Sequence, residues 1–293
     1  MIKSDNRALY ILTIAIIFFA IVSSAMGLFY MDGGRPYNFV NQYGDTIKIY
    51  GDGIYTHDSY SKALISRGTD FTILFIAIPL LIASLVYDIK RKTLKSRMLL
   101  TSVISLFTYY STSISFGVTY NKLHLIYIVL FSVSFFSLII AMSSIDTKTV
   151  SKYVEGTFSY RGINILLILT GISLVVAWLP DIIGSLLSNR SLELIEVYTT
   201  EITYILDMGI ISPVAFICFY LLKKKDGMGF VLLEMLLIVC ILIGIMLPIQ
   251  TIFQLQGGIQ IPFPVLITKV GIFCLLAFYA LFFEIRLFKS IKA

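Results

Sequence analysis

The sequence predicts an all-α protein embedded in a membrane, because of its composition, its long apolar runs and the placement of its basic residues. Of its 293 residues, 58% are hydrophobic and 14% are charged, whereas soluble domains carry about 25% charged residues. Membrane crossings of about 20 residues each would use nearly the whole chain. We therefore expect a single integral membrane domain over residues 1–293, with no separate soluble domain.

Eight apolar runs are each long enough to cross a bilayer as a helix. They cover residues 8–30, 70–88, 98–119, 123–144, 162–180, 201–222, 230–252 and 266–286. The first run stays apolar beyond Ala25, so it resembles a retained first helix more than a cleaved leader. The predicted fold is a bundle of about eight transmembrane helices.

The basic residues predict the orientation of this bundle. If the N-terminus is cytoplasmic, sixteen of the 23 Lys and Arg residues fall on the cytoplasmic side: Lys3, Arg7, Lys90, Arg91, Lys92, Lys95, Arg97, Lys148, Lys152, Arg161, Lys223, Lys224, Lys225, Arg286, Lys289 and Lys292. Such an excess is typical of cytoplasmic loops. We expect a multi-pass protein of the cell membrane with both termini cytoplasmic. Because these loops account for the net charge of +6, no nucleic-acid partner is expected.

The longest loop, residues 31–69, is predicted to form a small extracytoplasmic cap between the first and second helices. Within it, TIKIYGDGIYTH reads as two short β runs about a GDG turn. Asp58 is expected to cap the helix of SYSKALISR, and Gly68 to end it. Thr69 or Asp70 then caps the second span.

The sixth run carries Asp207 about two helical turns from its outer end. A charged residue costs about 2.5–3.5 kcal/mol near the centre of a membrane helix, so Asp207 is expected to face the bundle interior. Tyr204 shares its face, and Pro213 interrupts the helix shortly afterwards. An acid beside a broken helix is typical of transporter sites. Arg67 is the predicted partner of Asp207, and a pair that serves only helix packing is equally compatible with the sequence.

Other polar residues within the spans are candidates for binding. Six hydroxyl residues recur on one face of the third run, Thr101, Ser105, Thr108, Thr112, Ser115 and Thr119. They indicate either a wetted path or close helix packing with hydroxyls bonded to their own carbonyls. Gln250 and Gln254 share a face of the seventh run and favour hydrogen bonds between helices. The candidate ligand-binding residues are Arg67, Asp70, Thr108, Thr112, Tyr204, Asp207, Gln250 and Gln254.

The sequence offers little to metal or catalytic chemistry. Only His57 and His124 are histidines, and all three cysteines fall within predicted spans, so no imidazole-based metal site, disulfide framework or cofactor is expected. No hydrolase, zinc or nucleotide motif occurs, and we assign no catalytic residue. Glu234 is interpreted as reaching toward the lysine cluster at residues 223–225.

Two segments resemble blocks of a group of uncharacterised bacterial and archaeal polytopic membrane proteins. They are YGDGIYTHDSYSKALISRGTDFTILFIAIPLL and EVYTTEITYILDMGIISP, with the patterns GxGxY, DS, RGxD and YTTxxTYxLDxGIIxP. The resemblance extends over most of the chain, including YNKLHLIYIVLFSVSFFSLI. It implies a topology and a set of residues to test, and it implies no activity.

Three functions are compatible with these patterns. The first is a permease-like or ligand-binding protein with an outward-facing polar site for a small molecule or ion. The second is a sensor or assembly subunit that binds a protein partner through the outer cap, and it predicts an exposed apolar patch between Tyr37 and Tyr60. The third is a membrane enzyme acting on a lipid-linked substrate, which requires His57 beside a carboxylate in an outer cleft.

Overall fold

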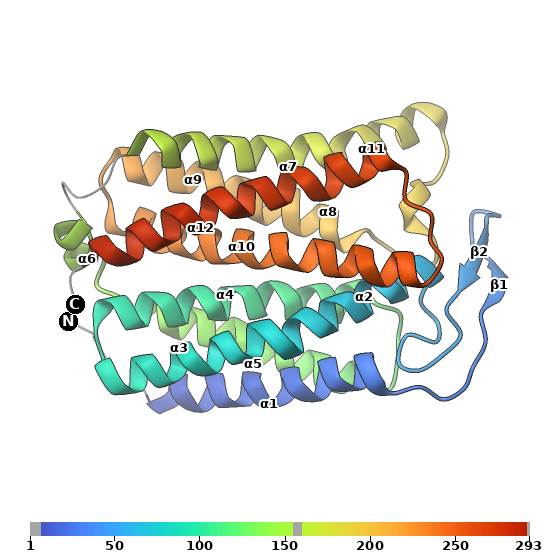
Figure 1. Ribbon diagram of the computed structural model, residues 1–293, viewed down its shortest axis with the longest axis horizontal. Helices are drawn as coiled ribbons and strands as arrows, with labels where there is room; N and C mark the ends of the chain where they lie inside the picture. The colour runs from blue at the N-terminus through green and yellow to red at the C-terminus, as the bar shows by residue number, and fades with distance from the viewer. Residues whose placement is uncertain (1–6, 155–159, 292–293) are drawn as a thin grey trace.

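The computed structural model describes residues 7–154 and 160–291, which form eight long helical rods packed side by side (Figure 1). The rods are α1 (Arg7–Phe29), α2 to α3 (Tyr60–Arg91), α4 (Leu94–Gly117), α5 (His124–Ser143), α7 (Tyr160–Ser188), α8 to α9 (Ile202–Lys223), α10 (Gly227–Gln256) and α11 to α12 (263–290). Each predicted span overlaps one rod. Rod α1 begins and rod α12 ends at the same end of the bundle, and the β-hairpin lies at the opposite end.

Three of the rods contain a wide π-helical turn, namely η1 (Ile73–Ala77), η3 (Asp207–Ile211) and η4 (Ile267–Gly271). They separate α2 (Tyr60–Thr72) from α3 (Ile78–Arg91), α8 (Ile202–Leu206) from α9 (Ser212–Lys223), and α11 (Phe263–Leu266) from α12 (Ile272–Ser290). In the second of these, the Ser212 N–H donates to the Asp207 carbonyl five residues earlier. Turns η1 and η3 each end two residues before a proline, Pro79 or Pro213. The widened turn accommodates a residue that has no N–H to donate.

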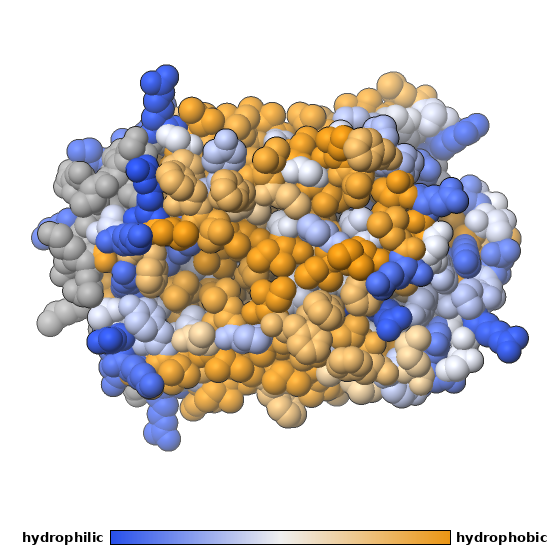
Figure 2. Space-filling model, viewed as in Figure 1, coloured by the Kyte–Doolittle hydropathy of each residue, from blue (hydrophilic) through white to orange (hydrophobic). Residues whose placement is uncertain are grey.

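The described residues contain six helices that are long and apolar enough to cross a membrane. Figure 2 shows the matching surface, an apolar band around the middle with hydrophilic residues gathered at both ends. Rod α4 is of similar length and falls outside this set, since it begins with Lys95 and Arg97 and is rich in hydroxyl residues. More than half of α4 is buried within the bundle, where hydroxyls need not face lipid.

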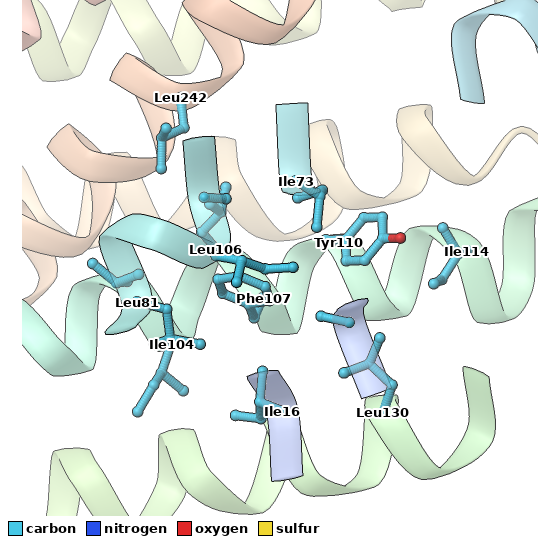
Figure 3. Close-up of a cluster of buried hydrophobic side chains, with 14 of the residues drawn as sticks. Ile16, Ile73, Leu81, Ile104, Leu106, Phe107, Tyr110, Ile114, Leu130 and Leu242 are labelled. Carbon is cyan, nitrogen blue, oxygen red and sulfur yellow. The ribbon is translucent and has the colours of Figure 1, made fainter. Parts of the chain in front are cut away.

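The apolar core has two parts. One is built around α1, α3, α4 and α5 and includes Ile16, Leu81, Phe107 and Leu130 (Figure 3). The other is built around α7, α9 and α12, and α10 contributes residues to both. The division into two cores leaves room between them for a large cavity.

The cap between α1 and α2 contains a β-hairpin whose second strand coincides with the first predicted β run, but its turn does not lie at GDG. Strands β1 (Tyr37–Val40) and β2 (Thr46–Ile49) pair antiparallel, with Tyr37 opposite Ile49. The turn lies at residues 41–45, where the Asn41 side chain accepts hydrogen bonds from the Tyr43 and Asp45 amides. The GDG segment follows the hairpin. Gly51 has φ of +78°, and a side chain there would overlap the Arg35 carbonyl. This glycine therefore lets the backbone of residue 51 lie against that of residue 35, and it does not form the turn of the hairpin.

The predicted helix boundaries between residues 58 and 70 are wrong. Ser59, not Asp58, is the N-cap of α2, and its hydroxyl accepts from the Lys62 amide. The helix does not end at Gly68, because there the missing side chain lets α10 approach: a Cβ would lie 2.6 Å from the Gln250 Cα. Thr69 and Asp70 consequently lie inside a continuous rod and cap nothing.

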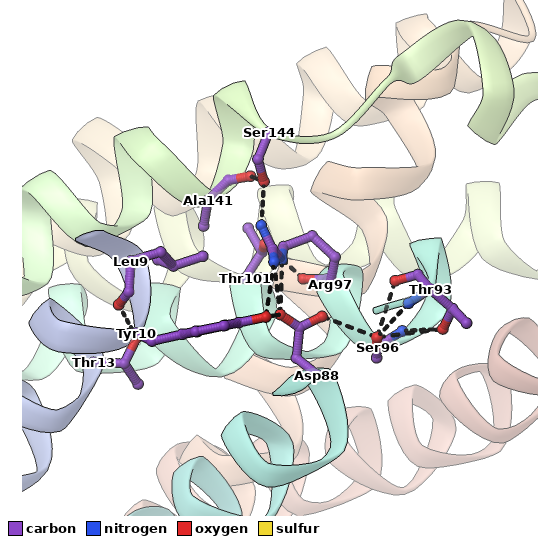
Figure 4. A network of polar contacts seen from close by, with 10 residues as sticks. All are labelled: Leu9, Tyr10, Thr13, Asp88, Thr93, Ser96, Arg97, Thr101, Ala141 and Ser144. Atoms are coloured by element: carbon purple, nitrogen blue, oxygen red, sulfur yellow. Dashed lines mark hydrogen bonds and ion pairs between the residues drawn. The ribbon is translucent and has the colours of Figure 1, made fainter. Parts of the chain in front are cut away.

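At the end opposite the hairpin, an ion pair ties four helices together (Figure 4). Asp88 of α3 and Arg97 of α4 are both fully buried, with a nitrogen-to-oxygen distance of 2.7 Å. Arg97 also donates to Ser144 just after α5, and Tyr10 of α1 donates to Asp88. The sequence pattern predicts only an orientation signal for Arg97, whereas the structure gives it this buried role.

Glu234 does not reach toward the lysine cluster. Its side chain is 1% exposed, and neither of its carboxyl oxygens has a hydrogen-bond partner. It lies near Glu284 of α12, because the face of α10 that carries it packs inward.

Candidate functional site

A cavity of about 1890 Å³ separates the two apolar cores. Its walls come from α2, α4, α7, the α8 to α9 rod, α10 and α12, and Tyr43 and Asp45 of the hairpin turn belong to its outer margin. The deeper lining is apolar and includes Leu236 and Leu276. The cavity thus extends from the hairpin end into the middle of the bundle.

Asp207 is the acid that lies deepest in this lining among the described residues. It opens the π turn η3, it is 5% exposed, and its two oxygens accept from different helices. The Tyr109 hydroxyl of α4 donates to Oδ1 at 2.9 Å, and the Trp178 indole N–H of α7 donates to Oδ2 at 2.9 Å. Both donors are uncharged groups, and among the described residues no Lys or Arg forms an ion pair with the carboxyl group. It keeps the capacity to hold a proton or a cationic ligand.

The Trp178 side chain also organises the wall beside Asp207. Its ring stacks on Tyr204, with ring centroids 4.8 Å apart and planes 24° from parallel. The Tyr204 hydroxyl donates to Asp181 at 2.8 Å. Trp178 and Asp181 share one face of α7, and Tyr204 and Asp207 share one face of the neighbouring rod. Each side chain of one pair therefore contacts a side chain of the other pair across the two helices.

The outer margin of the cavity is polar and joins the cap to the segment before α8. Lys62 of α2 forms an ion pair with Glu201, and its ammonium lies 4.2 Å from the centre of the Tyr198 ring. Glu196 accepts a hydrogen bond from the Ser59 hydroxyl. Burial raises the pKa of Glu196, although the Ser59 hydrogen bond and the Lys62 charge oppose the rise.

Asp58 lies beneath this margin and is 1% exposed. It accepts hydrogen bonds from the Thr119 amide and hydroxyl, at 3.0 and 2.9 Å, and from the Tyr198 hydroxyl at 2.8 Å. Burial raises its pKa from 3.8 to about 6, against the lowering effect of these donors. Asp58 thus connects the cap to the ends of two rods.

Arg67 and Asp207 do not form a pair. The Arg67 guanidinium donates to the Tyr50 hydroxyl at 2.7 Å and to the Leu28 carbonyl at 3.1 Å, and it does not line the cavity. The residue enters from the expected side of the bundle, but its helix turns it toward α1 and the cap. The predicted contact is wrong because apolar patterning indicates depth and does not set the rotation of one helix against another.

Asp70 lies outside the cavity, behind two tyrosines that line it. It is fully buried and accepts from the Tyr55 hydroxyl at 2.6 Å and the Tyr110 hydroxyl at 3.1 Å. Gly27 of α1 lies so close that a Cβ there would overlap the Asp70 carboxyl group.

The hydroxyl face of α4 is turned away from the cavity. Thr108 donates to the Ile104 carbonyl at 3.1 Å and Thr112 to the Thr108 carbonyl at 2.7 Å. These bonds to the helix's own carbonyls agree with a role in helix packing and not with a wetted path. A different face of α4, with Tyr109 and Ser113, lines the cavity.

Gln250 and Gln254 both line the cavity and also join α10 to α2. The Gln250 amide donates to the Thr69 hydroxyl at 2.7 Å, and the Gln254 amide donates to the Ser61 hydroxyl at 3.0 Å. These are the interhelical hydrogen bonds that the sequence favours. Of the predicted binding residues, the cavity brings together Tyr204, Asp207, Gln250 and Gln254.

The cavity also contains residues that the sequence analysis missed, above all Trp178 and Asp181. The predicted span stopped at Pro180, whereas α7 continues through this proline to Ser188. A signal was present, because apolar residues continue beyond Pro180 and Trp178 is the single tryptophan of the chain.

The charged residues in the described lining are mainly acidic. Six are carboxylic acids and two are basic: Asp45, Asp181, Glu193, Glu196, Glu201 and Asp207 against Lys62 and Arg190. Lys62 is paired with Glu201. The surplus of acids favours positively charged ligands.

The described residues form neither a metal site nor a catalytic pair based on histidine. Among residues 7–154 and 160–291, no group of three or more His, Cys, Asp or Glu is arranged to hold a metal ion. His57 is exposed, and within the same ranges it has no hydrogen bond or ion pair with a carboxylate. The arrangement that an enzyme based on His57 requires is therefore not formed in the described residues.

Comparisons with known proteins give no further guide, since no protein-family model, curated protein or solved structure matches this chain. The resemblance of the two segments to a group of polytopic membrane proteins stays a prediction.

Proposed function

We propose that the chain spans the membrane eight times with both termini in the cytoplasm, and that its outward-facing cavity binds an organic cation. In this proposal the protein is a permease-like or ligand-binding membrane protein. The hairpin end faces outward, because the opposite end carries most of the Lys and Arg residues. The observation that supports the ligand class best is the surplus of carboxylic acids in the described lining, together with the uncharged donors Tyr109 and Trp178 that hold the deepest acid, Asp207.

The lining changes character with depth, which suits an amphipathic molecule. Near the hairpin end it is polar, with Lys62, Glu201 and Asp181. Toward mid-bundle it becomes apolar, with Leu236 and Leu276. A cationic group bound at Asp207 would donate a charge-assisted hydrogen bond to the carboxylate or form an ionic contact with it, while an attached apolar group packs deeper. Trp178 and Tyr204 offer aromatic faces to the same cation.

The test is thermal unfolding of the purified protein with alkylammonium compounds and with alkylsulfonates of matched chain length. A ligand that binds only the folded state stabilises it by about 2.7 kcal/mol at a hundredfold excess over Kd. We expect stabilisation by the ammonium compounds and its loss in Asp207→Asn. The matched control is Asp226→Asn, which removes a carboxylate from the N-cap of α10, where asparagine caps equally well. Equal stabilisation by sulfonates, or by ammonium compounds in Asp207→Asn, would contradict the proposal.

The hairpin favours a second candidate function, that of a sensor or assembly subunit. Four of its apolar or aromatic side chains, Tyr37, Phe39, Val40 and Tyr43, are between 46% and 60% exposed. Patches of this kind mark interaction sites, and this one lies where the second sequence hypothesis predicted it. Replacing Phe39 and Val40 with serine would abolish partner capture if this function holds, and would leave ammonium binding in the cavity unchanged.

A further inference from the structure

A second polar site lies on the inner side of the cavity floor, between α10 and α12. Glu234 of α10 is 1% exposed and Glu284 of α12 is 7% exposed. Three of their four carboxyl oxygens, both of Glu234 and Oε2 of Glu284, are buried without a hydrogen-bond partner. Buried polar atoms without partners cost about 1–3 kcal/mol each, and charged ones more, so their presence calls for an explanation.

The packing of the two helices places these carboxyl groups toward the inner end of the bundle. The helices run antiparallel and approach closely at Gly244, where a Cβ would overlap that of Ala277. Glu234 precedes this contact in α10 and Glu284 follows it in α12. Leu236 and Leu276 line the deep part of the cavity, and Glu234 is two residues from Leu236 on the inner side.

The surroundings supply too little positive charge for two carboxylates. The two glutamates act on each other electrostatically, and Lys95 of α4 is the cation that acts on Glu234. The Lys95 ammonium is partly exposed and lies 3.9 Å from the centre of the Phe288 ring.

Three other cations on the elements around the pair have partners of their own. Arg97 of α4 is bound to Asp88, Lys223 of α9 lies over the Phe219 ring, and Arg286 of α12 lies over the Phe282 ring. Lys148 and Lys152 lie on α6 (Thr147–Val154), a short helix that packs on α10. In the described residues none of these makes an ion pair with Glu234 or Glu284.

We propose that Glu234 and Glu284 form a proton-binding site, in which the two buried carboxyl groups together hold one proton. Two carboxylates in one buried site repel each other strongly, and a shared proton removes one of the charges. The remaining negative charge is attracted by the Lys95 ammonium. The site stands on residues that do not line the cavity, and it does not depend on what the cavity binds.

The position of the site connects it to the cavity. Buried acids between a ligand cavity and the opposite end of a bundle occur in the proton relays of pumps and transporters. The α10 helix carries both elements, with Glu234 below the floor and Gln250 in the cavity wall.

The test is infrared spectroscopy of the purified protein at mildly alkaline pH, with the glutamate carboxyl carbons labelled with ¹³C. The label separates glutamate bands from those of the buried aspartates and needs no substitution. We expect a ¹³C-shifted carbonyl band of a protonated carboxylic acid in the wild type. This band should disappear in the double variant Glu234→Gln and Glu284→Gln. The matched control is Glu193→Gln, which removes an exposed glutamate and should leave the band unchanged.

Two results would overturn the proposal. One is a wild-type spectrum with carboxylate bands only, which would mean that both groups are ionised. The other is a set of carboxylate bands that respond to added sodium or calcium ions and to a chelator, which would identify a metal-cation site instead. Since the wild-type measurement needs no variant to fold and no ligand, a failure of the cavity proposal would leave this result unaffected.

Discussion

The buried ion pair of Asp88 and Arg97 should be the most sensitive polar contact in the fold. Replacing Arg97 with methionine removes two hydrogen bonds to Asp88, at 3.0 and 2.7 Å from the guanidinium nitrogens. It leaves a fully buried carboxylate with only the hydroxyls of Ser96 and Tyr10 as donors. Breaking a buried pair in this way costs about 3–5 kcal/mol. We expect Arg97→Met, and likewise Asp88→Asn, to lower the free energy of unfolding by about that amount.

The assay is thermal unfolding in detergent of proteins in which Cys240 and Cys274 are replaced by alanine, followed with a thiol-reactive dye that then reports exposure of the buried Cys218. Arg91→Met is the matched control, because it removes an exposed arginine at the end of α3 and should change stability by no more than about 0.5 kcal/mol. The double variant of Asp88→Asn and Arg97→Met should be less destabilised than the sum of the two single variants. Additive single effects, or an Arg97→Met protein as stable as Arg91→Met, would refute the reasoning.

Three further predictions concern packing and the cap. Gly68→Ala should lower the free energy of unfolding by about 1–3 kcal/mol, because the added methyl group forces α2 away from Gln250. Gly184→Ala is the control: its Cβ meets open space, so it should be neutral or raise the free energy of unfolding by up to about 1 kcal/mol. Thermal unfolding of the two variants measures both effects. Burial raises the pKa of Asp58 from 3.8 in the unfolded chain to about 6 in the folded protein. Below pH 3.8 the carboxyl group is protonated in both states and its ionisation costs no stability, and between pH 3.8 and 6 the cost rises to about 3 kcal/mol. The free energy of unfolding should therefore fall with pH over this range in the wild type and change less in Asp58→Asn. Thr112→Val should change stability by less than about 0.5 kcal/mol, since the hydroxyl bonds only its own helix, and a larger loss in the same assay would argue against the packing role.

The positions of the rods could be predicted from the sequence because a helix that crosses a membrane needs a long run of apolar residues. The helix ends could not, since polar residues such as Asp70 and Asp181 lie inside rods wherever the bundle offers partners. The hairpin was expected around GDG because glycines favour tight turns, but the backbone used their freedom to approach residue Arg35 closely.

The candidate site was predicted in part, at the level of single residues. The cost of burying a carboxylate identified Asp207, and helix periodicity added Tyr204. The partners of Asp207, Tyr109 and Trp178, could not be predicted. They face Asp207 because of the way α4 and α7 are rotated about their axes, and the apolar pattern of a single helix does not determine that rotation. The π turn that presents Asp207 likewise depends on tertiary packing, although Pro213 marked the place where the helix departs from regular geometry.

The most direct test of the central claim is the accessibility of the cavity wall beside Asp207 from outside the cell. In a variant without native cysteines, Ser113→Cys places a thiol in the cavity lining, and Ser134→Cys places one in the buried interior as a control. Removal of the native thiols matters because Cys240 lines the cavity. Intact cells would be treated with membrane-impermeant methanethiosulfonates carrying either an ammonium or a sulfonate group. The account predicts that the thiol at position 113 is modified from outside, faster by the cationic reagent, and that the thiol at position 134 is not. Protection of position 113 from both reagents, or faster modification by the anionic one, would contradict it.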